Sequence, residues 1–168
     1  MPTAREIIAR LGLIPHPEEG GWYLETHRAE ETLPHDMLPG RYTGERRVST
    51  AIYYLLTPET FSHMHRLESD EIFHFHAGGP CEMLHLHPDG SGQVITFGND
   101  LMAGHSPQVV VGRNVWQGMR LLPGAPFALM GCTVAPGFEF ADYAHGDRQE
   151  LMAAYPAFTD QIIRLTAA

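Results

Sequence analysis

The fold of this chain is decided by the stretch Ser62-His-Met-His-Arg-Leu-Glu-Ser-Asp-Glu-Ile-Phe-His-Phe-His-Ala-Gly78. It contains two short runs of strand-forming residues, Phe61–Arg66 and Ile72–His76, on either side of a polar turn. In a regular strand, residues i and i+2 point to the same face and lie about 7 Å apart. We therefore predict that His63 and His65 present two imidazoles side by side on one face.

Similar short runs lie on both sides of this stretch and are separated by Gly- and Pro-bearing turns. They cover residues 49–57, 82–87, 93–97, 108–111, 115–121 and 127–134. Strands this short and this evenly spaced are typical of an antiparallel sandwich or barrel. The sequence therefore predicts an all-β domain.

Helices are predicted only at the two ends of the chain. Thr3-Ala-Arg-Glu6 is a capping-box signature, and Gly12 is a stop signal, so residues 3–11 are expected to form a short helix. Residues 148–155 and 159–165 are predicted to be helical, with a break at Pro156. Because no linker or low-complexity segment occurs, we expect one domain over residues 1–168.

Composition excludes several classes of protein and of partner. The chain has 168 residues, 43% hydrophobic and 18% charged, which is typical of a folded protein. No apolar run approaches the roughly 20 residues of a membrane span, and the first residues lack the apolar block of a signal peptide. The formal net charge of −9 disfavours nucleic acid and anionic membranes as partners. We expect a cytoplasmic protein in which Cys81 and Cys132 are buried, reduced thiols.

The quoted stretch also carries the residues of a possible metal site. His63, His65 and Glu71 form a plausible three-ligand set, and imidazoles with a carboxylate suit zinc, iron(II), nickel or manganese. Two further His-x-His pairs, His74/His76 and His85/His87, follow at steps of 11 residues. For these pairs an exposed or hydrogen-bonded arrangement without a ligand is the alternative interpretation.

These residues give the chain a resemblance to the cupin superfamily. His63, His65, Glu71 and Gly78 resemble its first motif, G-x5-H-x-H-x3,4-E-x6-G, although five residues separate His65 from Glu71. Where the second motif has a histidine, the fourth metal ligand, this chain has Trp116, followed by Gln117.

The chain also looks like the small single-domain cupins of bacteria and yeast, whose reaction is not established. The matching stretches include residues 18–28, 49–56, 65–66, 70–71, 116–117 and 136–142. In that group the position of His63 is often not a histidine. The resemblance implies a double-stranded β-helix (jelly roll), a homodimer, and kinship with metal-free sugar-nucleotide epimerases.

Three functions are compatible with such a barrel. The first is a metal-independent isomerase or epimerase that acts on a sugar or a related carbonyl compound. Its base would be His65, oriented by a carboxylate such as Glu71, and its acid would be one of the tyrosines at 23, 53, 54 and 143. Arg28 or Arg66 would hold an anionic substrate group.

The second function is a metal-dependent cupin enzyme with a divalent ion on His63, His65 and Glu71, with Gln117 as a further donor. The third is a binding or sensing module without turnover. In that module an aromatic cavity with a polar edge would hold a small molecule. The cavity would be lined by Trp22, Phe73, Phe75 and Trp116. The polar edge would be formed by Glu25, Arg28 and Gln117. Segment 1–28 and a second subunit are expected to cover the exposed sheet edges.

Overall fold

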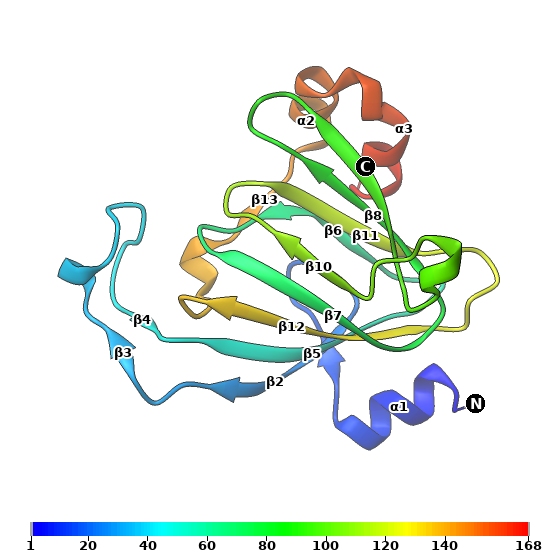
Figure 1. The fold of residues 1–168 in the computed structure, drawn as a ribbon, viewed down its shortest axis with the longest axis horizontal. Coiled ribbons are helices and arrows are strands. Elements are labelled where there is room, and N and C mark those ends of the chain that lie inside the picture. Colours follow the sequence, from blue (N-terminus) through cyan, green and yellow to red (C-terminus); the bar gives the residue numbers. More distant parts are fainter. Residues whose placement is uncertain (1, 168) are drawn as a thin grey trace.

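Two antiparallel sheets enclose the main hydrophobic core of residues 2–167, the part of the chain that this computed structural model describes (Figure 1). The first sheet contains, in spatial order, β1 (Ile14–Pro15), β2 (Trp22–Arg28), β5 (Thr50–Leu56), β12 (Ala128–Ala135), β7 (Asp70–Gly78) and β10 (Gln108–Val111). The second contains β13 (Ala144–His145), β6 (Phe61–Arg66), β11 (Trp116–Leu121), β8 (Cys81–Leu86) and β9 (Gly92–Phe97). This arrangement confirms the predicted jelly roll.

The core between the sheets is built by the inward-facing residues of both. Tyr54 and Phe73 from the first sheet pack with Met83 and Met119 from the second, and all four are almost completely buried. Along β7, Glu71, Phe73 and Phe75 alternate with outward-facing residues, as strand geometry requires. The same inward row therefore begins with a carboxylate and continues into apolar core.

Short helices cover the outer faces of the two sheets. Helix α1 (Ala4–Leu11) begins with the predicted capping box at Thr3 and ends at Gly12, whose φ is 69°. Its residue Ile7 packs with Leu55 of the first sheet and with Phe127, which directly precedes β12. The second sheet is covered by helices α2 (Arg148–Ala154) and α3 (Thr159–Arg164) (Figure 1). The short helix η4 (Pro156–Phe158) connects the two.

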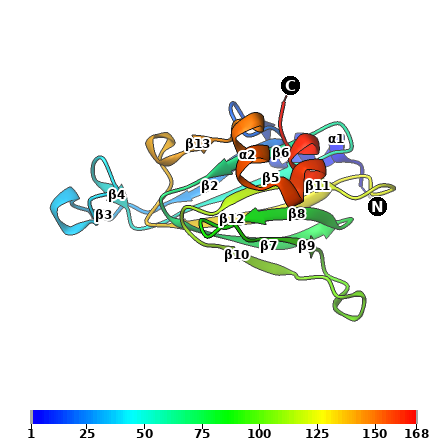
Figure 2. The same cartoon turned by 90° about the horizontal axis from the view of Figure 1, so that it is seen from above.

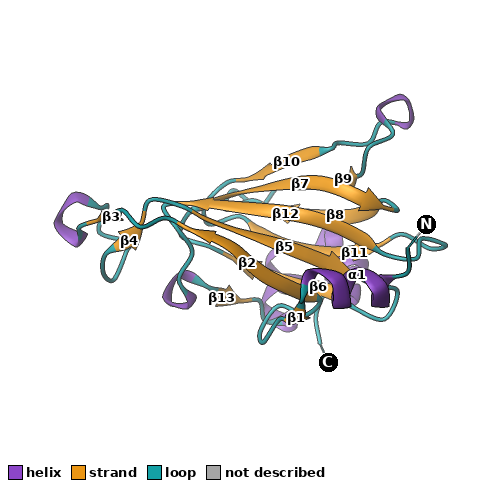
Figure 3. Cartoon of the chain, turned by 90° about the horizontal axis from the view of Figure 1, so that it is seen from below, coloured by secondary structure: helices purple, strands orange, loops and turns teal. Residues whose placement is uncertain are grey.

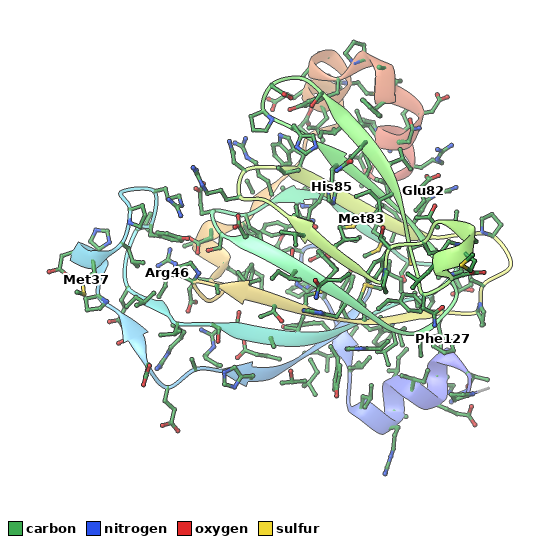
Figure 4. The ribbon with its side chains drawn as sticks, in the orientation of Figure 1. Met37, Arg46, Glu82, Met83, His85 and Phe127 are labelled. Atoms are coloured by element: carbon green, nitrogen blue, oxygen red, sulfur yellow. The ribbon has the colours of Figure 1, made fainter. Side chains whose placement is uncertain are left out.

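An arm that includes the polar, Pro- and Gly-bearing residues 34–44 projects from the barrel (Figures 1, 2 and 3). It consists of β3 (Thr32–Leu33), the short helix η1 (His35–Met37) and β4 (Arg46–Arg47). Figure 4 places Met37 at the far end of the arm and Arg46 at its base. At the base, Arg46 forms a buried ion pair with Asp142 of η3 (Phe140–Asp142).

Two smaller expectations concern the cysteines and the membrane. Cys81 and Cys132 are both free and buried, as predicted. Within residues 2–167 no helix has the length and apolar character needed to cross a bilayer.

The remaining short helix, η2 (Leu101–Ala103), lies in the connection between β9 and β10.

Candidate functional site

A cavity of about 250 Å³ lies between the sheets at one end of the barrel. At this end β6 finishes, β7 begins and β12 finishes, so His65, Glu71 and Val134 all reach the cavity. Its volume is slightly below the range of roughly 300–1,000 Å³ that is usual for small-molecule sites. Further lining comes from β2, from the loop before it, from β5, and from the segment that leads to β13.

The loop before β2 positions Glu19 beside the cavity. Gly20 and Gly21 have φ values of 90° and 71°, which side-chain-bearing residues rarely adopt. A Cβ on Gly20 would lie 2.5 Å from the carbonyl oxygen of Phe61, so the backbone can approach β6 only with glycine there. The carboxylate of Glu19 accepts a hydrogen bond of 2.5 Å from the Ser62 hydroxyl. Glu19 is therefore fixed against β6.

Strand β6 contains a β-bulge that decides which of its residues face the cavity. Gln117 of β11 pairs with His65, but Met119 pairs with Ser62, so β6 has one more residue than β11 over this interval. Ser62 and His65, three positions apart, therefore both point inward, and Met64 packs outward under α2 and α3. The regular i, i+2 rule does not hold between His63 and His65.

His63 lies away from the cavity, contrary to the sequence-based expectation. Its Nδ1 donates to the carbonyl oxygen of Met64 at 3.1 Å, and its Nε2 accepts from the Ala167 amide at 2.9 Å. Its ring stacks on His145 at a centroid distance of 3.8 Å. Both ring nitrogens are thus occupied, and burial lowers the pKa of His63. The bulge removes His63 from the predicted metal set.

The remaining residues do not complete such a set. Among residues 2–167 no group of three or more His, Cys, Asp or Glu side chains is arranged to hold a metal ion. The residues of this barrel therefore do not fit the metal centre that the cupin motif implies.

His65 and His16 present opposite hydrogen-bonding faces to the cavity. Nδ1 of His65 lies 2.7 Å from the His63 carbonyl oxygen, which can only accept, so Nδ1 carries the proton and Nε2 of the neutral ring has a free lone pair. Nδ1 of His16 accepts from the Glu19 amide at 2.9 Å, so the neutral ring carries its proton on Nε2. Burial lowers the pKa of His16 and favours this neutral form.

Glu19 lies between these two imidazoles. Its Oε2 is 3.7 Å from Nε2 of His65 and 4.0 Å from Nε2 of His16. Tyr143 stacks on the His65 ring at 5.2 Å and is itself held by a 3.0 Å contact between its hydroxyl and Nδ1 of His145. Burial, followed by the charge of Glu19, raises the pKa of Tyr143, so its hydroxyl stays protonated.

Glu71 is the buried carboxyl group of the cavity. Its Oε2 accepts a hydrogen bond of 2.7 Å from Nε2 of Gln117 on the opposite sheet. Burial, and then the charge of Glu19, raise the pKa of Glu71 to about 7, against the lowering effects of His65 and Gln117. A carboxyl group with this pKa exchanges a proton near neutral pH.

This raised pKa predicts a pH-dependent loss of stability. The folded protein favours protonated Glu71, so its contribution is fully present below pH 4.5 and is lost as the pH rises through about 7. The shift corresponds to about 3 kcal/mol. We expect urea unfolding from pH 4 to pH 8 to show this decline as a falling difference between the wild type and Glu71→Gln, because the buried histidines, whose lowered pKa values raise stability with pH, contribute to both proteins alike. Parallel curves for the two proteins, with Glu31→Gln as the surface control, would contradict the prediction.

A clamp centred on Arg28 lies at the mouth of the cavity. Its guanidinium donates to both carboxylate oxygens of Glu25 at 2.9 Å, to Glu139 at 2.7 Å, and to the carbonyl oxygen of Phe138 at 3.3 Å. The clamp joins β2 to the segment before η3 and holds Phe138 and Phe140 at the mouth. Arg28 and Glu25 therefore line the cavity, as predicted, but the donors of Arg28 are already engaged by protein oxygens.

The other predicted site residues lie outside the cavity lining. Trp22 packs under α1 on the outer face of the first sheet, and Phe73 and Phe75 belong to the main core. Trp116 faces outward towards α2 and α3, where the guanidinium of Arg66 lies 4.5 Å from its ring centroid. Gln117 faces inward but reaches Glu71 rather than the cavity itself.

A second buried polar residue lies beside Gln117 on the neighbouring strand. Gln117 pairs with His85 of β8, and the His85 side chain is 2% exposed (Figure 4 labels His85). Burial lowers the pKa of His85 to about 4, so its ring is neutral. Among residues 2–167, neither Nε2 of His85 nor Oε1 of Gln117 has a hydrogen-bond partner.

Sequence reasoning missed two residues at the centre of the site. His16 is one of several isolated histidines in the chain, and Glu19 is one of two adjacent glutamates, so neither stands out by spacing. The signal that could have identified Glu19 is the Gly-Gly pair after it, because consecutive glycines mark a backbone that must approach another strand closely. Tyr143 was one of several candidate tyrosines; of the others, Tyr54 donates its hydroxyl to the Gly20 carbonyl and Tyr53 contacts His76.

The fold and the cavity together define a cupin. The chain belongs to the family described as Cupin superfamily (DUF985), whose model matches residues 5–146. It is 31% identical over 149 residues to the uncharacterized protein YML079W of Saccharomyces cerevisiae, a match that covers 84% of this chain and 74% of the yeast protein.

Solved structures of similar chains agree with this assignment. A hypothetical protein from Leishmania major superposes with a TM-score of 0.88 at 29% identity, over 99% of this chain and 100% of the other. Protein SO0799 from Shewanella oneidensis gives a TM-score of 0.86 at 33% identity, over 99% of both chains.

Proposed function

We propose that this cupin is a metal-independent enzyme that moves a proton next to the carbonyl group of a small molecule, as an isomerase or epimerase does. The observation that carries the proposal is the pair of imidazoles with opposite tautomers in one cavity. Nε2 of His65 offers a lone pair, and Nε2 of His16 offers an N–H. Enolisation needs a base at carbon and a donor at the carbonyl oxygen.

Each residue then has a defined task. His65 removes the proton from the carbon beside the carbonyl, and the resulting imidazolium is stabilised by Glu19, whose Oε2 is 3.7 Å away. Neutral His16 donates its Nε2–H to the oxygen on which negative charge develops. Glu71, with a pKa of about 7, returns a proton to the carbon from another direction.

The experiment that tests this function is solvent exchange. The wild-type protein, treated with a chelator, is incubated in D₂O with a panel of small aldoses, ketoses and other carbonyl compounds. We expect deuterium to enter the carbon next to the carbonyl of at least one compound, as followed by proton NMR. Exchange that occurs only after a divalent metal is added would contradict the proposal, and binding without any exchange would favour a non-catalytic binding module.

Two further expectations are kept as part of the proposal. A two-fold homodimer is supported by the open sheet edges at β9 and β10, where Val94 and Val110 are 45% and 57% exposed. A cytoplasmic location is supported by Cys81 and Cys132, which are free thiols of the kind that reducing compartments preserve.

A further inference from the structure

The charges around the cavity are strongly unbalanced. Four carboxyl groups line it, from Glu19, Glu25, Glu71 and Glu139, and Arg28 is the single guanidinium among the lining residues. Arg28 is shared between Glu25 and Glu139 in the clamp at the mouth, so these three groups together retain one negative charge. The mouth therefore repels an anion rather than holding one.

The interior has no lysine or arginine beside its two carboxyl groups, and Glu71, with a pKa of about 7, is only partly ionised near neutral pH. Glu19 and Glu71 face His16 and His65, whose hydrogen bonds to the backbone set the tautomers described above. Ser62 and Gln117 donate neutral hydrogen bonds to these carboxylates, at 2.5 Å and 2.7 Å. A buried carboxylate without a cationic partner is costly, and a bound cation would remove that cost.

The cavity also has a polar atom that points to a ligand. His65 is 2% exposed, and among the described residues its Nε2 makes no hydrogen bond within 3.5 Å. A buried, unpartnered acceptor that faces a cavity is satisfied by a donor from water or from a bound molecule. An N–H of an ammonium group is such a donor.

Aromatic rings form much of the remaining wall. Tyr23 lies edge-on to His16 at 4.6 Å, Tyr143 stacks on His65, and Phe138 and Phe140 pack edge-on at the mouth. Aromatic faces attract organic cations through their quadrupoles, and carboxylates beside such rings strengthen this preference. A metal ion gains little from such walls, and within residues 2–167 no arrangement of metal-ligating side chains is present.

We propose that the ligand of this cavity is a small organic cation, namely a carbonyl compound that carries an ammonium group. This inference rests on the proposed function for the carbonyl part, and the ammonium part rests on the charges and rings of the cavity wall. The ammonium group would lie between Glu19 and Glu71, against Tyr143 and near Nε2 of His65. The anionic substrate expected from Arg28 and Arg66 is replaced by a cationic one.

The test uses probes that are matched in shape and differ in charge. Choline is compared with 3,3-dimethyl-1-butanol and 3,3-dimethylbutanoate, and ethanolamine with ethylene glycol and glycolate, by calorimetry at pH 7.5. We expect the cationic member of at least one series to bind at least about tenfold more tightly than the neutral member. The anionic members should not bind.

Variants distinguish this proposal from its alternatives. Glu19→Gln should reduce the preference for the cation about tenfold, while Glu31→Gln, which removes the same charge from the exposed surface, should leave it unchanged. Because choline and ethanolamine carry no carbonyl group, their binding is measured independently of proton transfer, so a failure of the proton-transfer function would not affect this result. The proposal is overturned if no cationic probe binds, if an anionic probe binds as tightly, or if Mn²⁺ alone binds stoichiometrically through Glu19.

Discussion

Replacing His65 by glutamine is expected to lower kcat/KM by about 10²–10⁴-fold for the substrate found by solvent exchange. Glutamine keeps a polar side chain of similar length, but its amide has no basic nitrogen to take the proton. Because His65 is the proposed base of the chemical step, the loss should fall mainly on kcat. Steady-state kinetics with separate kcat and KM values provide the measurement.

A matched control lies two residues away on the same strand. His63→Gln makes the same substitution within the bulge, where the ring contacts Ala167 and His145 and not the cavity. We expect this variant to keep kcat within a few-fold of the wild type. Full turnover in His65→Gln, or equal losses in both variants, would refute the role of His65 as the base.

Replacing Asp142 by alanine is expected to destabilise the fold by about 3–5 kcal/mol. Asp142 accepts two hydrogen bonds from Arg46, at 2.8 Å and 2.5 Å, and the two residues are 5% and 3% exposed. The substitution leaves the guanidinium buried with only the Gly44 and Glu45 carbonyl oxygens as acceptors. An unpaired buried charge costs more than the pair contributes.

Thermal unfolding measures this effect, and a double variant is its control. A loss of this size should lower Tm by roughly 6–20 °C for a chain of this length. Arg46→Met combined with Asp142→Leu removes both charges and should recover most of the loss. A Tm change of Asp142→Ala below about 2 °C would show that water reaches Arg46 and that the pair does not anchor the arm.

The fold followed from sequence because its signals are local. The runs at 61–66 and 108–111 match β6 and β10 residue for residue, and the capping box at Thr3 gave the first helix its start. Turn residues and strand propensity act over a few positions, so they can be interpreted without knowledge of the tertiary structure. The family motif added the jelly-roll topology, which local patterns cannot define.

The site was predicted only in part, because it depends on pairing between strands. His65, Glu71, Glu25 and Arg28 line the cavity as expected. Trp116 and Trp22 do not, since their faces are set by strand register and by the helices that cover the outer surfaces. The identity of the extra residue in β6 is also invisible in the sequence, because a bulge appears only when β6 is aligned with β11.

The bulge has a consequence for how β6 can vary among related chains. One of the two residues between Ser62 and His65 is extra relative to β11. Without it, Ser62 and His65 would lie two positions apart, and regular strand alternation would still direct both side chains into the barrel. The bulged segment instead contacts the C-terminal segment, because the Met64 amide donates to the Leu165 carbonyl oxygen and Nε2 of His63 accepts from the Ala167 amide. Loss of one residue here would therefore disturb the docking of the C-terminal segment rather than the lining of the cavity.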